Sequence, residues 1–378
     1  MNVIFTCGGT GGHINPAIAV ANIWKERHPD SDILFIGAKD RMEEELVPKA
    51  GFRLHTIPAS GISRERSLSG LKHNIKAVSY VLQSVGNCKK VIRDFGADVV
   101  VGTGGYASFP ALMAASMLGI PTCVHEANAM PGLTTRMIAN RVDRVLTCFP
   151  ESAKYYRHPE KVETVGMPVR REFIFTKKEE ARRELELDER PLIVSAFGSQ
   201  GAKVMNEAVA ELFRLEQAAG YPFQHIHATG SYGWEWMPER VRDMGIDLTA
   251  NNGITMQEYI YNMPTLMAAA DIFISRAGAS SCNEIAAAGT PCILIPSPNV
   301  TDNHQEKNAR ALADKSAAVL LLEKDCTANA LMQEITALLS DSERRREMTI
   351  ALQKMCVLDS AEKLCDIIAE LGSRKQRR

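Results

Sequence analysis

A histidine that directly follows a glycine-rich run is the first feature with the makings of a reactive site. His13 comes after Gly8-Gly9-Thr10-Gly11-Gly12, which in turn follows the apolar run Val3–Thr6, and we expect a helix to begin after it, at about Ala17. Glycines let the main chain approach a ligand closely, and an imidazole can accept a proton near neutral pH. The run is not a P-loop, because no Gly-Lys-Ser/Thr closes it. It is not a dinucleotide fingerprint either, because the third glycine would fall at Ile14. We therefore expect His13 to be a ligand-binding residue or general base rather than a core residue.

A second candidate site lies where small residues separate a strand from a helix. Ala277–Ser281 follow the apolar run Asp271–Ile274 and precede a helix-forming stretch. A helix N-terminus offers N–H groups and a positive dipole end to an anion. Glu284 could accept hydrogen bonds from the two hydroxyls of a ribose. The alternative is an ordinary turn in which Ser280 or Ser281 caps the helix.

A third polar cluster follows another apolar run. His125, Glu126 and Asn128 come directly after Pro121–Val124. A histidine, a carboxylate and an amide together are unusual for a plain turn, and they could bind or deprotonate a substrate.

These clusters are best explained by strands that alternate with helices. Apolar runs of strand length recur along the chain, and a second series begins at Leu192–Phe197, again followed by a glycine turn, Gly198–Ala202. The carboxyl ends of parallel strands meet at one edge of a sheet, where ligands of such folds bind. We predict an α/β protein with two Rossmann-like, doubly wound parallel-sheet domains that face each other across a cleft, with one substrate per domain.

Composition excludes several classes of protein. The chain has 378 residues, of which 45% are hydrophobic and 24% charged, and its formal net charge is −1. A general nucleic-acid binder would be clearly basic, so no nucleic-acid partner is expected. The nine cysteines show no C-x-x-C pair, which favours reduced core residues over a zinc site or disulfides. No signal peptide or run of about 20 apolar residues is present, so we expect a cytoplasmic protein whose membrane contact is peripheral.

Two further segments allow more than one interpretation. Asp30-Ser31-Asp32 resembles a metal-binding Asp-x-Asp, but it precedes its strand and so lies at the wrong edge of the sheet; we interpret it as a turn and predict no metal site. The segment Leu71–Arg93 has helical periodicity with interleaved lysines. It is either a helix facing the core or a surface that contacts a membrane through Lys72 and Lys76.

The ordered motifs resemble the MurG family, the bacterial N-acetylglucosaminyltransferases of peptidoglycan synthesis. The resemblance rests on Gly8–His13, Gly104-Gly105-Tyr106, His125-Glu126-x-Asn128, Pro168-Val169-Arg170, Gly198–Ala202, Arg276-x-Gly278-Ala279, Glu284-Ile285 and Gln305-x-x-Asn308-Ala309. One departure is Met167, where asparagine is expected. The resemblance implies a GT-B fold with an acceptor and membrane-facing domain at 1–165, a donor-binding domain at 166–345, and a C-terminal helix at 346–378 that returns to the first domain.

The resemblance also implies a reaction and its residues. N-acetylglucosamine would move from UDP-GlcNAc to lipid I, undecaprenyl-pyrophosphoryl-MurNAc-pentapeptide, giving lipid II with inversion at the anomeric carbon. His13 is the candidate base, with Glu126 as the runner-up, and Tyr106 and His125 lie on the acceptor side. The donor residues would be Thr10, Gly11, Gly12, Asn128, Arg170, Ser199, Ile260, Ala279, Ser280, Ser281, Cys282, Asn283, Glu284 and Gln305.

The same resemblance sets expectations for cofactors, partners and location. No cofactor is required, although a divalent cation could stimulate transfer. The partners would be UDP-GlcNAc, membrane-bound lipid I, an anionic phospholipid surface and other cell-wall synthesis proteins, at the cytoplasmic face of the cell membrane. Two other classes stay open. One is a different sugar-nucleotide enzyme of the same fold, such as a diacylglycerol glucosyltransferase or an epimerase. The other is a non-catalytic nucleotide-sugar-binding protein, against which His13 and the presence of both halves in one chain argue.

Overall fold

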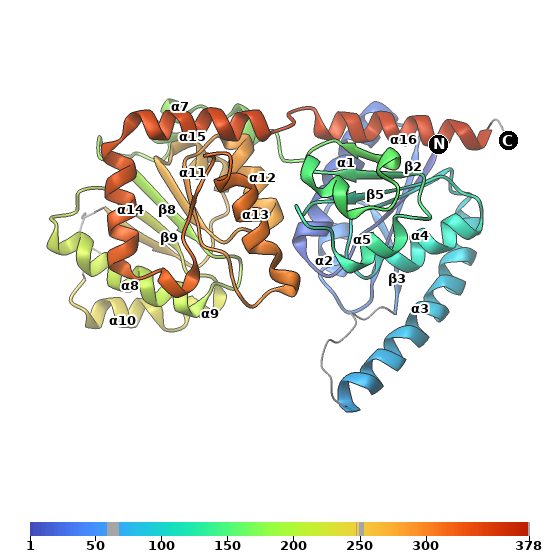
Figure 1. Ribbon diagram of the computed structural model, residues 1–378, viewed down its shortest axis with the longest axis horizontal. Coiled ribbons are helices and arrows are strands. Elements are labelled where there is room, and N and C mark those ends of the chain that lie inside the picture. The colour runs from blue at the N-terminus through green and yellow to red at the C-terminus, as the bar shows by residue number, and fades with distance from the viewer. Residues whose placement is uncertain (59–67, 247, 249–252, 377–378) are drawn as a thin grey trace. The chain divides into compact units, whose positions relative to one another are not determined.

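The computed structural model describes residues 1–58, 68–246, 248 and 253–376, with the backbone alone for 68–78, 301 and 374–376. The chain divides into two compact units, Met1–Val169 with Val357–Arg378, and Arg170–Cys356 (Figure 1). The boundaries expected from the sequence, after residues 165 and 345, lie slightly before the boundaries between these units, which fall after residues 169 and 356.

The first unit is built on a seven-stranded sheet in the order β3-β2-β1-β4-β5-β6-β7. All of its pairings are parallel. The strands are β1 (Asn2–Thr6), β2 (Asp32–Ala38), β3 (Arg53–Ile57), β4 (Val99–Gly102), β5 (Thr122–Glu126), β6 (Arg144–Thr147) and β7 (Val162–Thr164). The central strands β1, β4 and β5 are almost wholly buried, as their unbroken apolar sequences predict. The sequence pattern did not predict the edge strands β3 and β7, because both carry exposed residues and lack such runs.

Helices from both ends of the chain cover this sheet. They are α1 (Gly11–Arg27), α2 (Glu43–Lys49), α3 (Leu68–Phe95), α4 (Ser108–Met117), α5 (Leu133–Ile138), the 3₁₀ turns η1 (Pro150–Tyr155) and η2 (Pro159–Lys161), and α16 (Ser360–Gln376). Leu364 and Ile368 of α16 join Val20 and Trp24 of α1 in one buried apolar cluster. The last helix therefore completes the core of the first unit.

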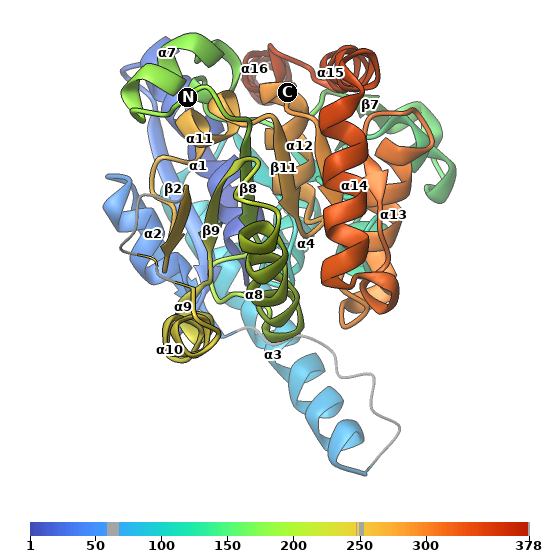
Figure 2. The same ribbon diagram turned by 90° about the vertical axis from the view of Figure 1, so that its left-hand side faces the viewer.

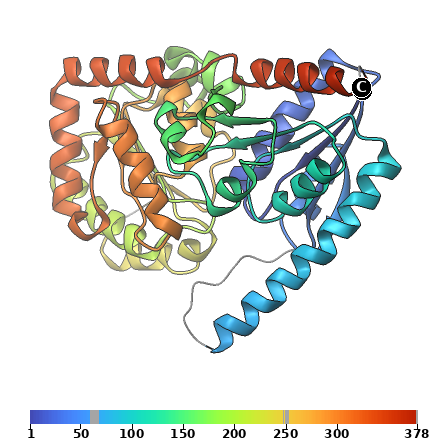
Figure 3. The ribbon, with the colours of Figure 1, turned by 45° about the vertical axis from the view of Figure 1, so that its right-hand side comes forward.

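Helix α3 confirms the helical periodicity of its sequence, and its C-terminal part packs against the core. Cys88 and Ile92 are buried against α4, whereas Leu82 is 70% exposed. The N-terminal turns of α3 extend away from the sheet (Figure 3). The choice between a core-facing helix and a membrane-contacting surface depends on side chains that lie outside the described residues, those of Leu71, Lys72, Ile75, Lys76 and Val78.

The second unit repeats the design with a six-stranded sheet in the order β10-β9-β8-β11-β12-β13. The strands are β8 (Leu192–Ala196), β9 (Gln224–Ala228), β10 (Ile254–Gln257), β11 (Ile272–Ser275), β12 (Cys292–Leu294) and β13 (Val319–Leu320). The helices and 3₁₀ turns are α6 (Glu172–Phe175), α7 (Lys178–Glu184), α8 (Lys203–Ala218), α9 (Ser231–Trp234), α10 (Met237–Asp243), α11 (Met263–Ala269), α12 (Ala279–Ala288), η3 (Thr301–Asn303), α13 (His304–Ala313), η4 (Glu323–Asp325), α14 (Ala328–Ser340) and α15 (Ser342–Met355). All pairings of this sheet are again parallel, so the predicted pair of doubly wound sheets is confirmed.

Helix α8, which lies beside β8 and β9 in Figure 2, is joined to this sheet by a chain of buried polar side chains. Ser195 Oγ lies 2.7 Å from both His225 Nε2 and His227 Nδ1, and His225 Nδ1 lies 2.7 Å from Glu216 Oε1. All four side chains are fully buried. Burial, followed by the proximity of His225, lowers the pKa of His227 to about 3, which keeps this imidazole neutral.

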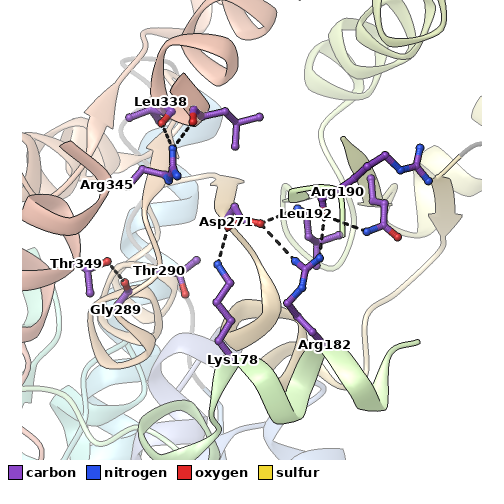
Figure 4. Close-up of polar contacts among 12 residues, drawn as sticks. Lys178, Arg182, Arg190, Leu192, Asp271, Gly289, Thr290, Leu338, Arg345 and Thr349 are labelled. Atoms are coloured by element: carbon purple, nitrogen blue, oxygen red, sulfur yellow. Dashed lines mark hydrogen bonds and ion pairs between the residues drawn. The ribbon is translucent and has the colours of Figure 1, made fainter. Parts of the chain in front are cut away.

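A single carboxylate ties together the two central strands of the second unit (Figure 4). Asp271, just before β11, accepts a hydrogen bond from the main-chain N–H of Leu192 at 2.8 Å. It also forms an ion pair with Lys178, at 2.6 Å. Arg182 lies 3.5 Å from the oxygen that accepts the Leu192 N–H, and it donates to the carbonyl of Arg190 at 2.8 Å. This clamp fixes the amino ends of β8 and β11, and so the register of the strands whose opposite ends carry the candidate site.

Candidate active site

The strand order of each sheet reverses at one point, and the predicted polar residues gather there. In the first unit the reversal lies between β1 and β4, and in the second between β8 and β11. Loops that leave such adjacent strands in opposite directions frame a crevice at the carboxyl edge, where ligands of doubly wound folds bind.

In the first unit, His13 belongs to a helix that begins earlier than the sequence suggested. We expected a helix from about Ala17, yet α1 begins at Gly11, and the N–H groups of His13 and Ile14 both donate to the carbonyl of Thr10. The glycines at positions 11 and 12 thus form the first helical turn rather than a free loop. His13 is held on the first turn of a helix, which is more rigid than a loop would be.

The ring of His13 is oriented by the turn that follows β4. Its Nδ1 lies 3.0 Å from the carbonyl oxygen of Thr103, so Nδ1 carries the proton and Nε2 is the nitrogen that accepts one. The Thr103 hydroxyl donates in return to the His13 carbonyl. A Cβ on Gly104, whose φ is +94°, would lie 2.8 Å from His13 Nδ1. Only glycine leaves room for the imidazole here.

The two glycine turns of the first unit interlock. A Cβ on Gly105 would lie 2.0 Å from the carbonyl oxygen of Gly8, and a Cβ on Gly9 would lie 3.0 Å from the ring of Tyr106. The structure therefore brings Tyr106 and the Gly8–Gly12 run together, as their shared position at strand ends predicts.

The polar cluster at the end of β5 is mostly engaged in holding its own loop. His125 is buried, and its Nε2 lies 2.8 Å from the carbonyl oxygen of Gly166. Burial lowers the pKa of this histidine. Glu126 is also buried; one of its oxygens accepts from the main-chain and side-chain N–H groups of Asn128, and the other from the N–H of Gly132. This geometry favours His13 over Glu126 as the candidate base.

In the second unit, α12 begins at Ala279 with Gly278 as its N-cap residue. The expectation that Ser280 or Ser281 caps the helix is therefore wrong, because both lie within its first turn. Gly289 ends the helix in the left-handed conformation, with φ 66°, which glycine adopts readily. The residues Ala279–Asn283 thus present the first turn of a helix to the switch point between β8 and β11.

Glu284, on the second turn of α12, has the properties of a hydroxyl acceptor. Burial raises the pKa of its carboxyl to about 7, and the guanidinium of Arg170 opposes this rise. The group therefore titrates near neutral pH, which is typical of residues in binding and catalytic sites.

Three residues fix the loop that precedes α12, and the sequence did not assign a role to any of them. Arg276 donates to the carbonyl of Ile295 and pairs with Glu323, and the amide of Asn308 donates to the carbonyl of Ala277. Arg276 and Asn308 lie in motifs that the sequence singled out, whereas no local pattern marks Glu323. The groups that hold this loop come from the residue after β12, from η4 and from α13, so only the tertiary structure reveals the arrangement.

Three further residues that the resemblance assigns to the donor site lie around the same edge of this unit. Ser199 is exposed in the turn after β8, and Gln305 accepts from the N–H of Ser297 at 2.9 Å. Ile260 is buried beyond β10, and only the family resemblance had identified it.

Met167, the departure from the family pattern, is buried in the first unit, where the thiol of Cys148 donates to its sulfur at 3.8 Å.

The described residues contain neither a metal-binding cluster nor a helix that could span a membrane. Among the residues that the structure describes, no three His, Cys, Asp or Glu side chains form a group that could hold a metal ion. Asp32 begins β2, which places Asp30-Ser31-Asp32 at the edge opposite the candidate site, as expected. Within the described ranges, no helix has both the length and the apolar character needed to span a bilayer.

Comparison with known proteins places both halves of the chain in one family. The model of the glycosyltransferase family 28 N-terminal domain matches residues 3–147, and that of the C-terminal domain of the same family matches residues 192–364. A crystal structure of MurG from Acinetobacter baumannii superposes with a TM-score of 0.78 at 25% identity and covers 98% of this chain and 99% of its own. The predicted GT-B fold is therefore confirmed.

Full-length relatives are closer in sequence. The UDP-N-acetylglucosamine--N-acetylmuramyl-(pentapeptide) pyrophosphoryl-undecaprenol N-acetylglucosamine transferase of Acetivibrio thermocellus is 39% identical over 99% of this chain and 99% of its own. The enzyme of the same name from Thermoanaerobacter sp. is 41% identical over 98% of this chain and its own full length. On this similarity, and on the two switch-point sites, the chain belongs to the MurG family of glycosyltransferase family 28.

Proposed function

We propose that this protein transfers N-acetylglucosamine from UDP-GlcNAc to lipid I and so forms lipid II, with inversion at the anomeric carbon. The proposal is carried by one observation: relatives that match the chain over its length are named for this reaction, and the two switch-point sites have the chemistry that the reaction needs. One site presents a histidine oriented as a base, and the other presents a helix N-terminus beside an acidic side chain.

The donor binds at the second unit. The first turn of α12, at Ala279–Asn283, offers main-chain N–H groups to the diphosphate, and Arg170 adds a positive charge. Glu284 accepts the hydroxyls of the ribose, and Ser199, Ile260 and Gln305 complete the site. These groups stabilise the transition state, because they stabilise the charge that develops on the leaving UDP.

The acceptor binds at the first unit, where Tyr106 and His125 lie. His13 Nε2 takes the proton of the sugar hydroxyl as its oxygen attacks the anomeric carbon and UDP departs from the opposite face. Glu126 remains the second candidate for this role. The assignment of Thr10, Gly11, Gly12 and Asn128 to the donor stays a prediction from the family resemblance.

The acceptor's lipid places the reaction at a membrane. We expect reversible, peripheral binding to anionic phospholipid at the cytoplasmic face of the cell membrane, where other cell-wall synthesis proteins are potential partners. Basic residues near such a surface contribute about 1 kcal/mol each.

The decisive experiment measures transfer of radiolabelled sugar from UDP-GlcNAc to lipid I, with diacylglycerol as the competing acceptor. We expect lipid II as the product and no glycosylated diacylglycerol. Transfer to diacylglycerol alone would make this a different family 28 enzyme, and the absence of any transfer would favour a non-catalytic binding protein.

The same assay in EDTA tests the role of metal. Substantial transfer is expected, because helix N–H groups and Arg170 supply the positive charge. A complete loss that Mg²⁺ or Mn²⁺ restores would contradict this account.

A further inference from the structure

One of the three glutamates at the start of α2 is placed unlike its neighbours. Glu43 is fully buried, whereas Glu44 and Glu45 are exposed. A carboxylate is rarely buried without paired partners, because the loss of water around a charge is unfavourable. Its burial therefore calls for an explanation from its surroundings.

Glu43 is in contact with the glycine turn that leads to His13. Its Oε1 accepts hydrogen bonds from the main-chain N–H groups of Gly9 and Ala38, each at 3.1 Å. These two donors come from separate loops, one after β1 and one at the end of β2. The carboxylate thus joins the carboxyl ends of two neighbouring strands.

Two glycines make room for this side chain. A Cβ on Gly37 would lie 2.9 Å from Glu43 Cβ, and a Cβ on Gly8 would lie 3.0 Å from Glu43 Oε1. Neither glycine has the positive φ that would itself require the residue type. Glu43 fills the space beside Gly37, and beside Gly8 it shares the space with the Cβ of Ala107, which would lie 2.6 Å from a Cβ on Gly8.

The second carboxylate oxygen of Glu43 is buried and has no hydrogen-bond partner among the described residues. A buried charge with an unpaired oxygen is a poor source of stability compared with an apolar side chain of similar size. What the contact does provide is a fixed main-chain conformation, since the Gly9 N–H cannot rotate away without leaving the charge unsatisfied.

The conformation held by Glu43 continues directly into the candidate base. Gly9 lies between Glu43 and the ring of Tyr106, α1 begins two residues later, and Thr103 holds His13 Nδ1 at 3.0 Å. We propose that Glu43 is a positioning residue, which fixes the Gly8–Gly12 turn and thereby aims His13 at the acceptor hydroxyl. The inference rests on the proposed function, because it assigns Glu43 a role through the base of that reaction.

Two substitutions separate the reach of the side chain from its charge. Glu43→Asp keeps the charge but is one methylene too short to reach Gly9, and Glu43→Gln keeps an oxygen at the same distance. We expect Glu43→Asp to lower kcat roughly 10–100-fold, as a misplaced catalytic group does, with the KM for UDP-GlcNAc nearly unchanged. Glu43→Gln should keep most of the wild-type kcat. Glu45→Gln, an exposed glutamate on the same helix, is the matched control and should behave as wild type.

Circular dichroism and thermal melting establish that each variant is folded. A folded Glu43→Asp protein with wild-type kcat overturns the proposal, and so does a folded Glu43→Gln protein as impaired as Glu43→Asp. If Glu43→Asp does not fold, the result for Glu43→Gln decides. A folded Glu43→Gln protein with near-wild-type kcat supports positioning by the side-chain oxygen, whereas a folded Glu43→Gln protein with reduced kcat overturns it.

A double-mutant cycle then tests whether Glu43 acts through His13. In a His13→Ala background, Glu43→Asp should leave the residual kcat unchanged, because the group that it positions is gone. Effects that multiply instead would show that Glu43 acts elsewhere. Full activity of His13→Ala alone would refute the proposed base, an outcome distinct from any result on Glu43.

Discussion

The glycine turns at the first strands of the two units share one construction but are anchored differently. In the first unit, Gly105 packs against the carbonyl of Gly8 so closely that a Cβ would lie 2.0 Å away. In the second unit, a Cβ on Gly230 would lie 2.0 Å from the nitrogen of Gly201. Each turn is thus locked by a second glycine turn, with no side chain between them.

The anchors differ in charge and in origin. The turn of the first unit is held by the carboxylate of Glu43, which comes from α2. In the second unit a neutral amide holds the partner turn, because Asn206 of α8 donates to the carbonyl of Thr229, next to Gly230, at 2.7 Å. Beneath it lies the buried chain of Ser195, the two histidines and Glu216.

The position of the interlock also differs. In the first unit the partner turn follows β4, across the switch point, whereas in the second it follows β9, on the other side of β8. The first unit therefore uses its switch point to fix a side chain, His13. The second leaves the switch point to the N-terminus of α12, which can receive an anion. In the proposed mechanism, one fold thus serves a base in one half and a leaving group in the other.

The largest expected effect separates these two roles. His13→Ala should lower kcat by roughly 10²–10⁴-fold, since general-base catalysis contributes about that much, while the affinity for UDP stays nearly intact. Steady-state kinetics and calorimetry measure the two quantities. Activity within a few-fold of wild type would move the base to Glu126 or elsewhere.

The polar chain beneath the second turn should affect stability rather than catalysis. Glu216→Ala leaves the buried Nδ1 of His225 without its partner, which costs about 1–3 kcal/mol in the free energy of unfolding. Urea denaturation measures this loss, and Glu211→Ala, at a partly exposed site on the same helix, is the control. A folded Glu216→Ala protein with impaired kcat would assign this chain a role in the reaction.

The third effect concerns the donor. Glu284→Ala should weaken UDP binding by about 1–3 kcal/mol through lost hydrogen bonds to the ribose, and kcat at saturating donor should change less than KM. Calorimetry with UDP measures the loss. Unchanged affinity would remove Glu284 from the donor site.

A smaller, salt-dependent effect is expected at the membrane. The double variant Lys72→Glu, Lys76→Glu should bind anionic vesicles more weakly at low salt, by about 1 kcal/mol per residue, and the difference should shrink at high salt. Co-sedimentation with vesicles measures binding, and UDP affinity is the control for folding. Equal sedimentation at both salt concentrations would exclude this face and leave the basic tail at Arg374–Arg378 as the next candidate.

The smallest effect is a pH dependence of donor binding. Because burial raises the pKa of Glu284 to about 7, its carboxylate, the stronger acceptor, is lost as the pH falls through that value. The affinity for UDP-GlcNAc, whose diphosphate does not titrate there, should therefore rise by up to tenfold, or about 1.4 kcal/mol, from pH 6 to 8. Glu284→Gln should abolish the dependence; a variant that retains it would assign the titration to another group.

The sequence predicted those parts of the fold that depend on local pattern. The buried strands have unbroken apolar runs, and His13, Tyr106 and Glu284 could be placed at sheet edges because each follows such a run. The helix starts were less predictable. Glycines at 11 and 12 suggested a free turn, yet Thr10 accepts two N–H groups and the helix forms through them.

What the sequence could not reveal depends on contacts between distant residues. Glu43 looks like the first of three surface glutamates, and only the approach of two loops shows that it is buried. Glu323 pairs with Arg276 across 47 positions, which no periodicity can indicate. Ile260 carries no chemical signal of its own, since a buried isoleucine is usually core.

The return of α16 to the first unit has a consequence for synthesis on the ribosome. The apolar cluster around Val20 and Trp24 is incomplete until Leu364 and Ile368 arrive. The residues of the second unit, Arg170–Cys356, all emerge before that helix does. Domains generally fold as units during translation, so the half of the protein that is made second has its whole core available first. The N-terminal half, with His13 and Glu43 in place, reaches its final packing only after Leu364 and Ile368 have emerged.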